Sequence, residues 1–123
     1  MSEAPQRRRI SMTKEDFATL FQSAKEFPQL PADPNSENST VYPRQDLLDV
    51  LRELRMVRRQ LSGRRQLSSV EVELTTHQWE KLVSGIELTM ALLGPDGHRT
   101  RTGYTIHETS DAIAEVRRLL GMS

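Results

Sequence analysis

The stretch LSSVEVELTTHQWEKLV, residues 67–83, changes its hydrophobic period at Thr75 and therefore joins a strand to a helix. Apolar residues alternate with glutamates over 70–74, which predicts a half-buried strand. Thr75 and Gln78 then have the spacing of a capping box, which marks the start of a helix. The turn residues GPDG at 94–97 predict its end. The apolar face of this predicted helix consists of Trp79, Leu82, Val83, Ile86, Met90 and Leu93.

Immediately before this stretch, the segment RQDLLDVLRELRMVRRQLSGRR (44–65) predicts another helix, with Gly63 as its C-terminal stop. Its leucines and valines form a stripe over about a third of a helical wheel. Arginines lie on one flank of the stripe, and Asp46, Asp49 and Glu53 lie on the other. Because charged flanks of this kind orient a helix on a packing partner, we expect the stripe to pack on the Trp79 helix. Packing against a second copy of the chain is the alternative.

The C-terminal part, HRTRTGYTIH (98–107), alternates weakly and predicts a second strand over 99–107, which could lie parallel to the first in a β-α-β unit. Because two strands alone make a marginal sheet, the alternatives are that the strands pair across a dimer or that one of them is extended loop. Thr109 or Ser110 is expected to cap a last helix that ends at Gly121. Residues 70–83 are similar to the strand and first helix of ribbon-helix-helix repressors, but no second helix follows at the spacing of that family. No internal repeat is evident. The predicted fold is mainly α, with about four helices and a small two-stranded β element, and α+β is the alternative.

The N-terminal part is predicted to stand apart from this domain. Residues 1–12 are expected to be a flexible tail. Thr13 resembles an N-cap, and Phe17, Leu20 and Phe21 share one face of an amphipathic helix over 13–27. Residues 28–43 contain four prolines and no apolar period, which is typical of a linker. We therefore interpret the first helix as a tethered arm, docked on this chain or on another, and residues 44–123 as a single compact helical domain.

Composition excludes several classes of protein. The chain has 123 residues, no cysteine and no net charge, so it lacks a disulfide framework, a zinc-thiolate site and the basic excess of a general polyanion binder. It has no apolar run that could span a membrane and no signal-peptide core, so a cytoplasmic location is expected, in a bacterium or phage. No catalytic or phosphate-binding motif occurs, and His98 and His107 are interpreted as exposed loop residues. We expect no enzyme, no cofactor and no small-molecule substrate.

Function is therefore expected to reside in protein–protein contacts made by helix packing, as a homo-oligomer or as a subunit of a larger assembly. Residues 44–66 carry a net charge of +4 and residues 67–98 a net charge of −4, which could pair with each other. The residues predicted to contact a partner are Phe17, Leu20, Phe21, Leu47, Val50, Leu54, Val57 and Leu61. The alternative is a nucleic-acid-binding accessory or regulatory protein, in which an arginine ridge contacts phosphates. That ridge would consist of Arg52, Arg55, Arg59, Arg64 and Arg65.

Overall fold

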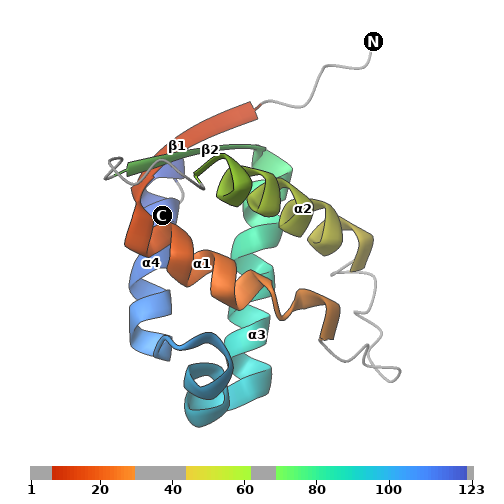
Figure 1. Ribbon diagram of the computed structural model, residues 1–123, viewed down its shortest axis with the longest axis vertical. Coiled ribbons are helices and arrows are strands. Elements are labelled where there is room, and N and C mark those ends of the chain that lie inside the picture. The colour runs from red at the N-terminus through yellow and green to blue at the C-terminus, as the bar shows by residue number, and fades with distance from the viewer. Residues whose placement is uncertain (1–6, 30–43, 62–68, 122–123) are drawn as a thin grey trace.

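The computed structural model describes residues 7–29, 44–61 and 69–121, and it is mainly α with a small two-stranded β element, as the sequence predicts (Figure 1). The sheet is antiparallel, and not the predicted parallel arrangement. The elements in chain order are β1 (Arg7–Thr13), α1 (Lys14–Ala24), the 3-10 helix η1 (Phe27–Gln29), α2 (Arg44–Leu61), β2 (Ser69–Thr75), α3 (Thr76–Thr102) and α4 (Ile106–Leu120). The strands form a ribbon at one end of the molecule, and the helices lie beneath it.

The ribbon corrects two predictions. Residues 7–12 belong to β1 rather than to a flexible tail, and β1 pairs antiparallel with β2, with Ile10 opposite Val72. The predicted strand over 99–107 is not part of the sheet. The physical reason lies in β1 itself, because its three arginines obscure a short alternation in which only Ile10 and Met12 are buried. A strand with so little apolar surface gains stability only by pairing, which a local pattern does not reveal.

The described elements repeat the order strand–helix–helix. Each strand ends at a threonine that caps the next helix, Thr13 for α1 and Thr75 for α3, and each helix buries an aromatic residue four positions later, Phe17 and Trp79. The second helix of each half packs on the first helix of the other half, because α2 contacts α3 and α4 contacts α1. The two halves therefore share one order of elements and pack their second helices on each other's first helices. This repeat was not predicted from the sequence, because the halves share a pattern rather than identities.

The turn residues at 94–97 interrupt the helix at Gly94, as the sequence predicts, but a second helical segment follows directly and α3 continues across this kink. Gly94 leaves the helical conformation with φ of 71°, and Pro95 then opens a further helical segment that reaches Thr102. Proline suits this position because the first residue of a helix needs no amide donor. The predicted strand over 99–107 is therefore helical or turn. The last helix is capped by Thr105, not by Thr109 or Ser110, and the buried Thr109 hydroxyl donates to the Thr105 carbonyl instead.

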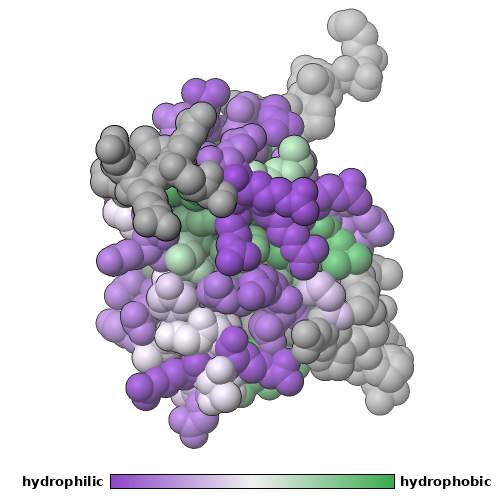
Figure 2. Space-filling view, in the orientation of Figure 1, coloured by the Kyte–Doolittle hydropathy of each residue, from purple (hydrophilic) through white to green (hydrophobic). Residues whose placement is uncertain are grey.

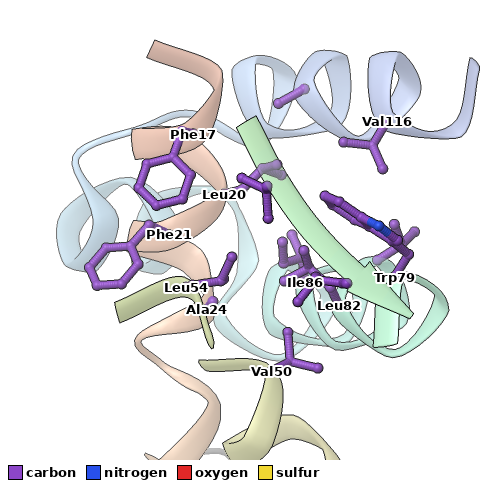
Figure 3. Close-up of a cluster of buried hydrophobic side chains, with 14 of the residues drawn as sticks. Phe17, Leu20, Phe21, Ala24, Val50, Leu54, Trp79, Leu82, Ile86 and Val116 are labelled. Carbon is purple, nitrogen blue, oxygen red and sulfur yellow. The ribbon is translucent and has the colours of Figure 1, made fainter. Parts of the chain in front are cut away.

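All four helices and both strands contribute to one core (Figure 3). The helix α1 is part of this core, so residues 13–27 are not an arm and the domain does not begin at residue 44. Of the eight residues predicted to contact a partner, Val57 and Leu61 are partly buried and packed against the core. The other six are buried within it: Phe17, Leu20, Phe21, Leu47, Val50 and Leu54. Residues 30–43 of the predicted linker lie outside the described residues.

Two contacts position the helices under the ribbon. The indole Nε1 of Trp79 donates a 2.9 Å hydrogen bond to the carbonyl oxygen of Arg8, which ties α3 to β1. At Gly85 the backbone of α3 is approached so closely that a Cβ there would lie 2.8 Å from Leu47 Cδ2 and 2.9 Å from the Phe27 ring. The close approach at Gly85 holds the inner side of α2 against α3, and the other side of α2 faces solvent.

Candidate interaction surface

The helix α2 has a buried inner face and a charged outer face. Its inner residues pack on α3, as the sequence predicts for the stripe and the Trp79 helix. Its solvent side carries Arg52, Arg55, Met56 and Arg59, all exposed, and we name these four residues the α2 outer face. Met56 is 49% exposed, which is high for a large apolar side chain. Figure 2 shows a strongly hydrophilic band over α2 with a smaller apolar area beside it.

The arginines of the α2 outer face have no ion-pair partner among the described residues. The neighbouring Arg58 takes another role, since its guanidinium lies over the Phe21 ring at 5.0 Å from the centroid. Arg64 and Arg65, and the predicted helix stop at Gly63, lie outside the described residues.

The predicted pairing of the +4 and −4 segments does not occur within the part of the chain that the structure describes. Glu71 and Glu73 of β2 pair instead with Arg7 and Arg9 of β1, at distances of 3.3 to 3.8 Å. Glu87 of α3 pairs with Arg117 of α4. The glutamates therefore pair with arginines that the β1–β2 pairing and the α3–α4 contact bring close to them. Both of these contacts join segments that are distant in the sequence. Within the described residues, the arginines of the α2 outer face are consequently left without a carboxylate partner.

The solvent face of the ribbon has its own charge balance. A two-stranded ribbon can enter the major groove of DNA, where basic and polar side chains contact the bases and backbone. In this ribbon the outward residues Arg7, Arg9, Glu71 and Glu73 neutralise one another across the strands. The phosphates of DNA would have to compete with these glutamates for the arginines. The ribbon is therefore not a basic surface.

The outward side of α3 carries carboxylates alternating with small residues. Glu80, Ser84, Glu87 and Ala91 recur at helical spacing opposite the buried Trp79 face, and we name them the α3 outer stripe. Glu80, Glu87 and Ala91 are exposed and Ser84 is half-buried. The α3 outer stripe was not predicted from the sequence, although it consists of the residues opposite the predicted Trp79 face.

The titratable groups offer no catalytic arrangement among the described residues. His98 is buried rather than exposed, and its ring nitrogens lie 3.2 Å from Ser23 Oγ and 3.0 Å from the Tyr104 carbonyl oxygen. That carbonyl can only accept, so Nδ1 donates to it and the contact is structural. Hydrogen bonds from the Thr105 backbone and hydroxyl lower the pKa of Glu108.

No family model, curated protein or solved structure matches the chain. Among the described helices, none is long and apolar enough to cross a membrane. No group of three or more potential ligand side chains gathers around a metal position in the described ranges.

Proposed function

We propose that the protein is an interaction subunit that binds another protein through the α2 outer face. The observation that carries this proposal is the half-exposed Met56 with Arg52 and Arg59 beside it, neither of which has a carboxylate partner among the described residues. Residues four before and three after a helical position are its surface neighbours. Methionine and arginine are enriched at protein interfaces, where a central apolar side chain is surrounded by groups that exclude water.

The buried inner side of α2 supports the proposal because it holds the outer face in place. Leu47, Val50, Leu51 and Leu54 are at most 4% exposed, so α2 needs no partner to remain docked. A partner therefore meets a preorganised surface and loses less conformational entropy on binding. The chemistry of this surface selects carboxylates, which guanidinium groups bind in a bidentate manner, arranged around a site that accepts the Met56 side chain.

Nucleic acid is the second candidate, since unpaired arginines in a row also suit phosphates. Two features weigh against it. The first is Met56, which occupies the middle of the row and whose apolar side chain has no use in phosphate contact. No aromatic side chain stands among these arginines to stack on bases.

Site-specific photo-crosslinking separates the two candidates. A photoreactive benzoylphenylalanine replaces Met56, and the matched control carries it at Ala114, which is exposed on α4. After irradiation in cells, a protein adduct at position 56 that resists nuclease and is absent from the control is expected. A nuclease-sensitive adduct at position 56 would contradict the proposal and select nucleic acid. Retention of purified protein on duplex DNA across a salt series, compared with the Arg55→Glu/Arg59→Glu variant, provides the independent measurement.

A further inference from the structure

We infer that the partner of the α2 outer face is a second copy of this chain, which presents its α3 outer stripe. The inference rests on the proposed function and names the partner. It starts from charge, because α2 exposes arginines without carboxylate partners and α3 exposes Glu80 without an arginine partner, within the described residues. Arg52 and Glu80 do not pair with each other within the described residues, and they can pair between two chains.

The spacing of the charges agrees on the two helices. Arg52 and Arg59 are seven residues apart on α2, and Glu80 and Glu87 are seven residues apart on α3. Seven residues of α-helix rise about 10.5 Å, so both pairs span the same length along their axes. Two helices lying side by side can therefore form both ion pairs at once.

The residues between the charges also correspond. Met56 stands four residues after Arg52, and Ser84 stands four residues after Glu80. In a parallel alignment the protruding methionine faces a small side chain, with one ion pair on either side. A large residue opposite a small one allows two helices to approach to about 8–10 Å. The alignment thus combines an apolar contact with two flanking charge pairs.

This contact joins different surfaces of the two copies. The inner faces of α2 and α3 already pack on each other within one chain, and their outer faces are exposed elsewhere. A single contact between these two unlike patches is heterologous, so it leaves the α3 outer stripe of one copy and the α2 outer face of the other copy free. Further copies can bind these free surfaces, which gives a ring or a filament, and a reciprocal pair of such contacts about a two-fold axis gives a closed dimer. Arg59 would share Glu87 with Arg117, so Arg52 and Glu80 form the stronger of the two pairs.

The test exchanges the two charges. Sedimentation velocity over a concentration series should show self-association of the wild type, and Arg52→Glu or Glu80→Arg alone should weaken it about tenfold or more. Mixing the two variants should restore association, because the glutamate of one then faces the arginine of the other. Arg99→Glu and Asp96→Arg, at exposed positions outside both surfaces, should associate as the wild type does. Circular dichroism confirms that each variant is folded.

The outcomes distinguish this inference from the proposed function. Benzoylphenylalanine at Met56 should crosslink to the peptide of a second copy that contains Ser84. A wild type that stays monomeric at every concentration overturns the self-association. If association occurs, is lost in Arg52→Glu and persists in Glu80→Arg, the α3 outer stripe is overturned and the α2 outer face stands. A nuclease-sensitive adduct overturns both.

Discussion

The guanidinium of Arg58 lies over the ring of Phe21, with its central carbon 5.0 Å from the ring centroid. Phe21 stacks in turn on Phe17, with centroids 5.9 Å apart, and is only 3% exposed. A cation from α2 therefore covers an aromatic pair on α1, and the arginine stem adds apolar contact. One of the seven arginines of segment 44–65 thus serves the fold and not a partner.

Replacing Phe21 should accordingly destabilise the whole domain. Phe21→Ala removes a buried ring and leaves a cavity, which costs about 3–5 kcal/mol in the free energy of unfolding. Arg58→Ala should cost only about 0.5–1 kcal/mol, because the cation–π contact is exposed to solvent. Urea denaturation followed by circular dichroism measures both. A Phe21→Ala variant as stable as the wild type would show that α1 is a detachable arm after all.

The pairing of β1 predicts a contrast between two adjacent residues. Ile10 is buried opposite Val72, so Ile10→Ala should lower the free energy of unfolding by about 2–5 kcal/mol. Arg9 is exposed to solvent, and Arg9→Ala should change the free energy of unfolding by about 0.5 kcal/mol or less. Thermal denaturation of the two variants gives the comparison. Equal stability of both would mean that residues 7–13 are not part of the fold.

These two residues also mark what could be predicted from the sequence. The strand–cap–helix stretch around Thr75 and Trp79 was predicted correctly because its alternation, capping box and apolar face are all local. The burial of Ile10 depends on a partner strand more than sixty residues away, so the same kind of strand was read as a tail. The exposed arginines of α2 were identified by their flank on the helical wheel. The lack of carboxylate partners for these arginines could not be predicted from the sequence. It arises because arginines of β1 and α4, which are distant in the sequence, pair with Glu73 and Glu87.

The close approach at Gly85 predicts an unfavourable effect of a single methyl group. Gly85→Ala would place Cβ within 2.9 Å of Leu47 and Phe27, which must move, at a cost of about 1–3 kcal/mol in the free energy of unfolding. Gly97 is the matched control, because a Cβ there meets only Leu93 Cβ at 3.4 Å. Gly97→Ala should raise the free energy of unfolding by about 0.4–1 kcal/mol by restricting the unfolded chain. Chemical denaturation that shows the same sign for both variants would contradict the packing of α2 and η1 on α3.

The capping box of α4 predicts a dependence of stability on acid. Hydrogen bonds from the Thr105 backbone N–H and hydroxyl favour the ionised form and hold the pKa of Glu108 below its usual range. A carboxyl with a lowered folded-state pKa stabilises the fold fully above its unfolded pKa, and this contribution disappears as pH falls through the folded pKa. Arg118 lowers the pKa of Glu115 in the same direction. The urea concentration at the midpoint of unfolding should therefore decrease as pH falls from the unfolded-state pKa of these carboxyls through their lower folded-state pKa values.

The substitution Glu108→Gln isolates the contribution of the capping box. A glutamine at this position still accepts from the Thr105 N–H, so the box persists, but its contribution no longer depends on protonation. The variant should show a shallower loss of stability in acid than the wild type. Carbon-detected NMR titration should place the Glu108 carboxyl below its ordinary midpoint, and Thr105→Ala, which removes the hydroxyl donor, should move that midpoint upward. A Glu108 midpoint that does not respond to Thr105→Ala would show that the hydroxyl does not stabilise the carboxylate.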